Sequence, residues 1–86
     1  MSITVIIVNW NGGDLLLDCL KHLQDQSAPA ESILLMDNGS TDGSAEKAAL
    51  IPGITVHFLN ENLGFAKANN IALEHCQTEW VALLNP

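Results

Sequence analysis

The sequence predicts an α/β fold, a Rossmann-like parallel sheet of about four strands with helices on both faces. Four short apolar segments alternate with segments of helical periodicity, and they lie at residues 3–8, 32–36, 54–59 and 80–84. The connections are short enough for each helix to be a right-handed crossover between parallel strands. We expect the strand order 3-2-1-4, which leaves a crevice between the carboxyl ends of the first and fourth strands.

The first strand is expected at "ITVIIV", which is apolar on both alternating faces, as in a strand covered on both sides. "NWNGG" breaks this strand, and Asp14 is predicted to cap the following helix. The apolar stripe of this helix repeats at i, i+4 and i+7, at Leu16, Leu20 and Leu23. Pro29 is expected to end the helix, within residues 26–30.

The second strand, "SILLM", leads into the polar turn "DNGSTDGS", where Asp42 is the predicted N-cap of a short helix that runs through Leu50. "ITVHFL" is the third expected strand. After the loop "NENLG", a helix is predicted from about Phe65 to Cys76, and "WVALL" forms the fourth strand. The 86 residues contain no internal repeat and no linker, so residues 1–86 are treated as one segment of a domain.

Composition excludes several classes of function. The net charge is −7, with ten acidic residues, three lysines and no arginine, and nucleic-acid binding requires clustered cations. Cys19 and Cys76 lie in apolar helical patterns, which indicates buried free thiols in a reducing compartment. No apolar run approaches the roughly 20 residues that span a bilayer. The sequence therefore predicts a cytoplasmic location and no nucleic-acid partner.

Several nucleotide-binding motifs that the fold would accommodate are absent from the sequence. "NWNGGD" lacks the G-x-G-x-x-G of a dinucleotide site, there is no P-loop, and no acid pair follows the first strand. The three histidines, His22, His57 and His75, lack metal-ligand spacing and are interpreted as surface or hydrogen-bonded core residues.

Two strand ends carry candidate binding residues. Trp10 follows the first strand, where its indole either packs on a helix or offers a stacking surface for a base. Asp37 and Asn38 end the second strand, and turn chemistry alone explains Asn38 well. Asp37 is expected to point into the crevice. A carboxylate or an amide there can accept the N3–H of a pyrimidine, and an amide can also donate to its carbonyl.

The third helix begins with small residues. Gly64, Ala68 and Asn70 could let its amino terminus approach a phosphate or a ribose, although close helix–sheet packing explains them equally well. Lys67 is interpreted as a solvated lysine.

Four stretches, "VIIVNWN", "LLMDNGSTDGS", "NLGFAKANN" and "WVALLNP", occur in the order and spacing of the family 2 glycosyltransferases. The sequence resembles most the rhamnosyltransferase-like branch that builds bacterial surface polysaccharides. The resemblance covers essentially all 86 residues. It implies a GT-A fold and inverting transfer from a nucleoside-diphosphate sugar, with the chain as the nucleotide-binding front of a longer domain.

The resemblance also assigns residues to the nucleotide. It implies that Trp10 stacks on the base with the backbone of Val8 nearby. Asp37 and Asn38 stand in the places of the usual pair of acids, so one of the two acids is replaced. The family's small-x-x-x-Ala-Arg-Asn pattern corresponds here to Gly64, Ala68, Asn69 and Asn70. Asn69 stands where an arginine is common, so the phosphate charge would be met elsewhere.

The carboxyl end resembles an "N-P-D" motif, of which Asn85 and Pro86 occupy the first two places. The resemblance implies that the next residue is the acid that holds Mg²⁺ or Mn²⁺, and that the catalytic base lies further on. We therefore expect an inactive fragment that holds no metal, from a parent enzyme with a divalent metal. The parent's expected partners are a UDP- or dTDP-sugar and a saccharide or glycolipid acceptor, with the parent peripheral at the inner face of the membrane.

Two other classes share this fold. A sugar-nucleotide nucleotidyltransferase normally carries a Gly- and Arg-rich phosphate loop after the first strand, which is missing here. In a non-catalytic flavodoxin-like module, the positions of Trp10 and Asp37 at the strand ends would have no functional reason. The low charged fraction of 15% leads us to expect exposed apolar surface. Self-association is expected as well, because 48% of the residues are apolar and the fourth strand would have an unpaired edge.

Overall fold

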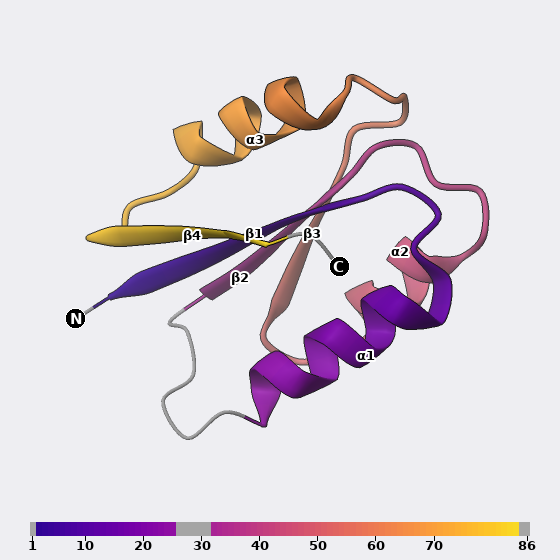
Figure 1. Ribbon diagram of the computed structural model, residues 1–86, viewed down its shortest axis with the longest axis horizontal. Helices are drawn as coiled ribbons and strands as arrows, with labels where there is room; N and C mark the ends of the chain where they lie inside the picture. The colour runs from indigo at the N-terminus through magenta and orange to yellow at the C-terminus, as the bar shows by residue number, and fades with distance from the viewer. Residues whose placement is uncertain (1, 26–31, 85–86) are drawn as a thin grey trace.

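The computed structural model describes residues 2–25 and 32–84, which form a four-stranded parallel sheet with helices on both faces (Figure 1). The strands are β1 (Ile3–Asn9), β2 (Ser32–Asp37), β3 (Ile54–Phe58) and β4 (Trp80–Leu84). The helices are α1 (Gly13–Gln24), α2 (Ser44–Ala49) and α3 (Phe65–Glu74). The strand order is β3-β2-β1-β4, so the predicted fold class and the predicted order are both confirmed.

The register of the sheet brings the ends of β1, β2 and β3 together. Asn9 at the end of β1 lies beside Asp37 at the end of β2, and Asp37 lies beside Phe58 at the end of β3. The loops that follow these strands therefore leave the sheet at one edge, which we call the carboxyl edge. Ligands of open α/β sheets bind outside this edge.

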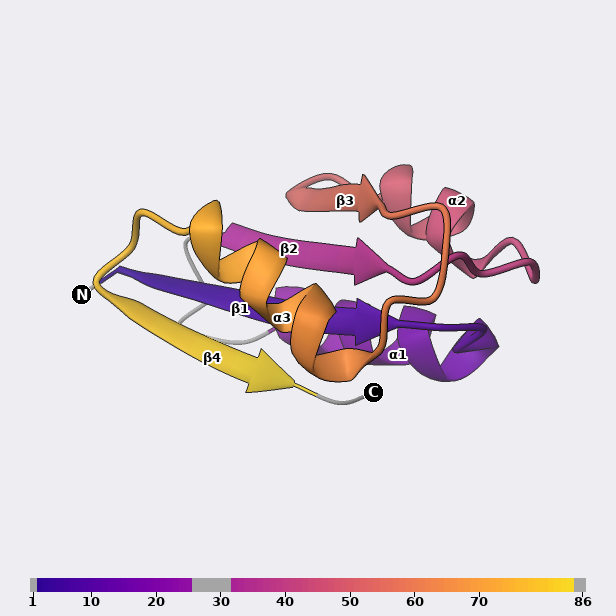
Figure 2. The same ribbon diagram turned by 90° about the horizontal axis from the view of Figure 1, so that it is seen from above.

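The two faces of the sheet have separate cores. Alternate residues of β1 and β2 pack against α1 and α2, in a cluster of Val5, Ile7, Ile33, Leu35, Leu16, Leu20, Ala48 and Ile54. The intervening residues pack under α3, in a smaller cluster of Ile6, Leu34, Met36, Ala68 and Ala72. Figures 1 and 2 show α3 alone on one side of the sheet. This period of two is the reason that β1 and β2 are apolar on both faces.

Helix ends differ in detail from the sequence-based expectations. The N-cap of α1 is Gly12, and Asp14 lies in the first turn rather than at the cap. The N-cap of α2 is Gly43, not the predicted Asp42. The Asp42 carboxylate nevertheless accepts a hydrogen bond from the Ser44 backbone N–H (3.0 Å), which forms an Asx turn at the start of the helix. Helix α2 ends at Ala49 and α3 at Glu74, slightly earlier than predicted. Pro29 lies outside the described residues.

Both cysteines are free thiols, and each is half-buried rather than fully buried. Burial raises the pKa of the Cys19 thiol, which favours its protonated form. Among the described residues, no helix is long and apolar enough to cross a membrane.

Candidate functional site

Asn9 is the centre of a polar network at the carboxyl edge. Its side chain is 1% exposed, and its Nδ2 donates to Asp37 Oδ1 (3.0 Å) and to Ser44 Oγ (3.0 Å). Its Oδ1 accepts a hydrogen bond from the Gly12 backbone N–H (3.1 Å). One buried amide therefore ties the end of β1, the end of β2 and the starts of α1 and α2 together.

Asp37 belongs to the same network. Its carboxylate is 2% exposed and accepts hydrogen bonds from the Ser40 hydroxyl (2.6 Å) and the Ser40 backbone N–H (3.1 Å), as well as from Asn9. The turn that begins with Asp37 is thus closed by its own side chain. The carboxylate is therefore directed into the interior of the loop. This differs from the prediction, in which it points into the crevice.

A second layer of hydrogen bonds joins the outer parts of these loops. The Asn11 side chain accepts from the Thr41 backbone N–H (2.8 Å), and the Asn11 backbone N–H donates to Ser40 Oγ (2.8 Å). The Asp42 carboxylate accepts from the Gly13 N–H (3.0 Å) and from Ser44. The hydrogen bonds from the Ser44 hydroxyl and backbone N–H, the hydroxyl first, hold the pKa of Asp42 below its usual range.

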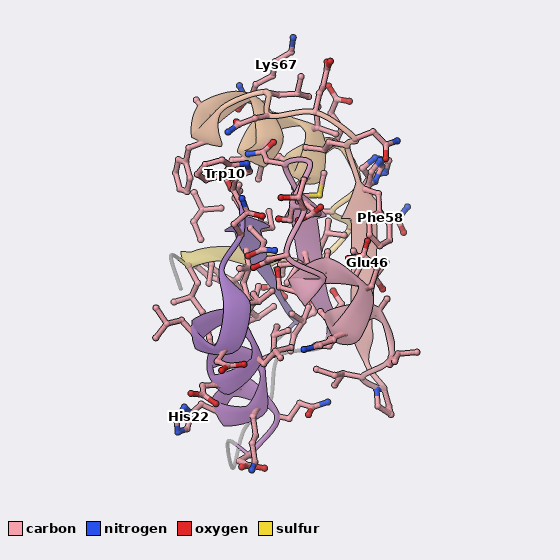
Figure 3. The ribbon with its side chains drawn as sticks, turned by 90° about the vertical axis from the view of Figure 1, so that its right-hand side faces the viewer. Trp10, His22, Glu46, Phe58 and Lys67 are labelled. Carbon is pink, nitrogen blue, oxygen red and sulfur yellow. The ribbon has the colours of Figure 1, made fainter. Side chains whose placement is uncertain are left out.

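A cavity of about 450 Å³ opens above this network, between the loop after β1 and the start of α3. Its lining residues are Val8, Asn9, Trp10, Gly12, Leu15, Asn38, Asn62, Gly64 and Phe65. Figure 3 shows Trp10 close to the start of α3, whereas Lys67 extends away from the molecule. The volume lies within the range of roughly 300–1,000 Å³ that is usual for small-ligand sites.

Trp10 supplies the apolar wall of this cavity. Its side chain is 58% exposed although it follows a strand whose core residues are fully buried. Phe65, at the start of α3, is another exposed aromatic side chain on the lining. Exposed rings beside polar amides form a surface on which a planar ligand can stack.

Asn38 supplies a polar wall. It is 3% exposed, its Nδ2 donates to the Gly64 carbonyl (3.4 Å), and its Oδ1 accepts from the Leu63 backbone N–H (3.3 Å). Both distances are near the upper limit for hydrogen bonds, so this amide is less firmly held than Asp37. It connects the end of β2 to the loop before α3.

The structure brings together four of the seven predicted site residues, because Val8, Trp10, Asn38 and Gly64 line the cavity. The other three, Asp37, Asn69 and Asn70, do not line it. Asn69 is buried in α3, and Asn70 is exposed on the same helix.

The sequence reasoning missed Asn9 and Asn62. Asn62 Oδ1 accepts from the Gly64 backbone N–H (2.9 Å) and so shapes the turn into α3. Asn9 could have been found from the register, since a polar residue ending a buried parallel strand must lie beside the residue that ends its neighbour.

The described residues do not offer a metal centre of their own at this edge. No group of three or more His, Cys, Asp or Glu side chains is gathered within residues 2–25 and 32–84. Asp37 is engaged by Asn9 and Ser40, and Asp42 by Gly13 and Ser44. The expected "N-P" residues, Asn85 and Pro86, lie outside the described part of the chain.

Known proteins with related sequences include a glycosyltransferase and a polymerase, named for teichuronic acid and teichoic acid respectively. TuaG of Bacillus subtilis, named for a glycosyltransferase role in teichuronic acid biosynthesis, is 34% identical over 87 residues, covering 96% of this chain and 34% of TuaG. A teichoic acid poly(glycerol phosphate) polymerase of Staphylococcus epidermidis is 30% identical over 89 residues, covering 98% of this chain and 12% of the polymerase. This chain thus spans about a third of the length of TuaG and about an eighth of the length of the polymerase.

A solved structure shares the fold. The mannosyltransferase PcManGT from Pyrobaculum calidifontis, in complex with GDP-Man and Mn²⁺, superposes with a TM-score of 0.86 at 28% identity, over 96% of this chain and 26% of that chain. The parallel sheet is therefore that of a GT-A glycosyltransferase. The family model for glycosyl transferase family 2 matches residues 4–86, and the chain belongs to this family.

Proposed function

We propose that this chain is the nucleotide-binding part of an inverting glycosyltransferase of the rhamnosyltransferase-like branch. The donor in this proposal is a UDP- or dTDP-sugar, such as the rhamnose derivative, and the acceptor is a surface polysaccharide or a glycolipid. The observation that carries it is the cavity at the carboxyl edge, lined by the indole of Trp10 and the amide of Asn38.

The base is proposed to stack on Trp10, beside the backbone of Val8. Asn38 is then the residue that reads the pyrimidine edge, since its amide can accept N3–H and donate to a carbonyl. The long hydrogen bonds that Asn38 makes to Gly64 and Leu63 would be exchanged for contacts with the base. Asp37 supports this contact from below by closing the turn that carries Asn38.

The phosphates and ribose are proposed to lie toward Gly64 and α3, where Asn69 and Asn70 belong to the first turns of the helix. A helix amino terminus acts as about half a positive charge and contributes roughly 0.3–1 kcal/mol at exposed sites. This is too little to offset a diphosphate on a chain with a net charge of −7. Lys67 does not line the cavity and extends away from the molecule (Figure 3).

The proposed reaction is direct displacement at the anomeric carbon. A base deprotonates the acceptor hydroxyl, the oxygen attacks the anomeric carbon from the side opposite the diphosphate, and the diphosphate leaves. A bound Mg²⁺ or Mn²⁺ supplies charge neutralisation on the leaving diphosphate. Residues 2–25 and 32–84 gather no cluster of three metal-ligating side chains. In this proposal the metal ligands and the base therefore lie elsewhere in the parent protein, and the described residues bind and orient the nucleotide.

The comparisons support several parts of this proposal. PcManGT was solved with a sugar nucleotide and a divalent metal, and the curated relatives are named for work on teichuronic and teichoic acids. They favour a sugar-nucleotide donor and a cell-wall or surface polymer. Because the nucleotide in PcManGT is a guanosine derivative, a GDP-sugar is the second candidate donor. We place the parent protein in the cytoplasm, peripheral at the inner face of the membrane.

We also propose that copies of this chain self-associate through β4, which is the terminal strand of the sheet. Three of its five residues are large and exposed, namely Trp80, Val81 and Leu83. A strand that is paired on one side only offers its free backbone groups to another strand.

The experiment compares two tryptophans with nearly equal exposure. Trp10 is 58% exposed in the cavity, and Trp80 is 57% exposed on β4. Calorimetric titration with UDP should show that Trp10→Ala weakens binding about tenfold or more, because base–aromatic stacking contributes roughly 1–3 kcal/mol. Trp80→Ala should leave the dissociation constant unchanged. Equal loss in both variants, or no loss in Trp10→Ala, would contradict the proposed base site.

A further arm adds Mn²⁺ to the same titrations. We expect Mn²⁺ to improve UDP binding little in the 86-residue chain, since its described residues gather no metal-ligand cluster. A strong metal dependence would require a metal ligand within this chain, and Asp37 or Asp42 would then be reassigned to that role.

A further inference from the structure

A second cavity lies on the α3 side of the sheet and shares no lining residue with the nucleotide cavity. Its volume is about 350 Å³. Its lining residues are Thr4, Ser32, Ile33, Leu34, Thr55, His57, His75, Gln77 and Thr78. Most of them carry hydroxyl, amide or imidazole groups, and no carboxylate is among them.

The register explains why this cavity is polar. On the α3 face, Ile6, Leu34 and Met36 are covered by the short helix α3. The same face continues toward the amino ends of the strands with Thr4 and Ser32, which lie side by side and share a hydrogen bond (2.9 Å). Thr4 also bonds Thr78 (2.7 Å). Helix α3 ends before it reaches this row, so hydroxyl groups form the floor of an open cavity.

Two histidines that are far apart in the sequence meet at the wall of this cavity. His57 is on β3, and His75 is the C-cap of α3. Their ring centroids are 5.2 Å apart, with an interplanar angle of 45°. Within the described residues, neither imidazole is hydrogen-bonded to another side chain or backbone group, so their ring nitrogens are available to a ligand.

The separation of the rings matches that of two imidazoles on one metal ion. A tetrahedral ion with Zn–N bonds of about 2.0–2.1 Å places the two ring centroids roughly 5 Å apart. We propose that His57 and His75 form a two-histidine site for a divalent transition metal of the Zn²⁺, Ni²⁺ and Cu²⁺ class, for which imidazole is a suitable ligand. Water within the polar cavity completes the coordination, because no third His, Cys or carboxylate group joins the pair among residues 2–25 and 32–84.

Two electrostatic features of the chain favour a cation at this place. His75 lies at the carboxyl end of α3, where the helix carbonyls carry a partial negative charge. The net charge of −7 raises the local concentration of cations around the chain. The ion would link β3, at one margin of the sheet, to the end of α3.

The test is a calorimetric titration of the 86-residue chain with Zn²⁺ in a buffer that does not bind metal. We expect one site, and we expect His57→Ala and His75→Ala each to weaken it about tenfold or more, as loss of a supporting metal contact does. His22→Ala is the matched control, because His22 is a solitary exposed histidine on α1 that points away from the molecule (Figure 3). It should bind Zn²⁺ like the unmodified chain.

Cys76 follows His75 directly, so a Cys76→Ser variant tests whether a thiolate carries the binding instead. Unchanged affinity in Cys76→Ser supports the histidine pair, and loss of binding there overturns it. His75 is exposed, so His75→Ala should fold even if the half-buried His57 is needed for stability. Zn²⁺ should also raise the Tm of the unmodified chain and of His22→Ala but not of His75→Ala. Equal effects in His22→Ala and His75→Ala would refute the site.

Discussion

The loops after β1 and β2 and the terminal strand β4 are built in opposite ways. In the loops, buried polar side chains such as Asn9 and Asp37 satisfy one another and the backbone. In β4, apolar side chains such as Trp80 and Leu83 are exposed, and the strand is paired only with β1 (Figure 2). The loops are thus preorganised before any ligand arrives, whereas β4 retains surface for further contacts.

This difference locates the effects of substitution. A change within the loop network should lower the free energy of unfolding, because it leaves buried groups without partners. A change on β4 should alter association and leave folding nearly intact, because the side chains there are already in water.

The largest effect is expected for Asn9→Ala. It removes the hydrogen bonds to Asp37, Ser44 and Gly12 in a buried site, and we expect a loss of about 2–3 kcal/mol in the free energy of unfolding. Urea denaturation followed by circular dichroism measures it. Glu46→Ala, at an exposed position of α2 (Figure 3), is the control and should change stability by less than about 0.5 kcal/mol. If both variants unfold alike, the network does not hold the loops.

Gly12→Ala should have the next largest effect, about 1–3 kcal/mol. A Cβ at this position would clash with Asn9 Oδ1 and would approach Leu16 Cβ to 3.1 Å. The clash requires the Asn9 amide. The Gly12→Ala/Asn9→Ala double variant should therefore lose less free energy of unfolding than the sum of the losses in the two single variants. Strict additivity in the same urea experiment would show that the two residues are not coupled.

Leu83→Lys tests the role of β4 in association. Light scattering should show dimers or larger species of the unmodified chain, and the lysine should shift the chain toward monomer, because charge on an edge strand blocks pairing. The stability of the monomer should change by less than about 0.5 kcal/mol, since Leu83 is 52% exposed. A clean monomer at all concentrations in the unmodified chain would rule out association through β4.

The smallest effect is expected from lowering the pH, which should reduce stability through Asp42 in the second layer of hydrogen bonds. The pKa of Asp42 is lowered mainly by the Ser44 hydroxyl. A carboxyl with a lower pKa in the folded state contributes stability above its unfolded pKa, and this contribution is lost as the pH falls through the folded value. Asp42→Asn should therefore flatten the acidic limb of a Tm–pH profile below the usual Asp range. An unchanged acidic limb would exclude Asp42 as its source.

The fold could be predicted from the sequence because each strand and helix has its own pattern. The alternation of β-branched runs with helical segments, joined by short crossovers, is enough to give the parallel sheet. The strand order was predicted as the commonest one for such sheets. Trp10, Asn38 and Gly64 were placed at the cavity because strand ends and helix starts meet at one edge. Topology therefore located these three of the nine residues that line the cavity.

The direction of individual side chains could not be predicted from the order and ends of the strands and helices. Asp37 was expected in the crevice, but Ser40 and Asn9 turn its carboxylate inward, and this depends on the loop conformation. The meeting of His57 and His75 depends on where α3 ends relative to β3, which sequence spacing does not give.

The central claim is that Trp10 and Asn38 form the base site of a sugar nucleotide. A Trp80→Phe variant leaves Trp10 as the one remaining indole of the sequence, so its fluorescence reports the cavity directly. Titration with UDP, TDP, GDP and ADP should quench it, with UDP and TDP binding several-fold more tightly than either purine nucleotide. Tighter binding of GDP would replace the pyrimidine donor by a guanosine one. Equal affinity for ADP and UDP, or no quenching by any nucleotide, would contradict the base site itself.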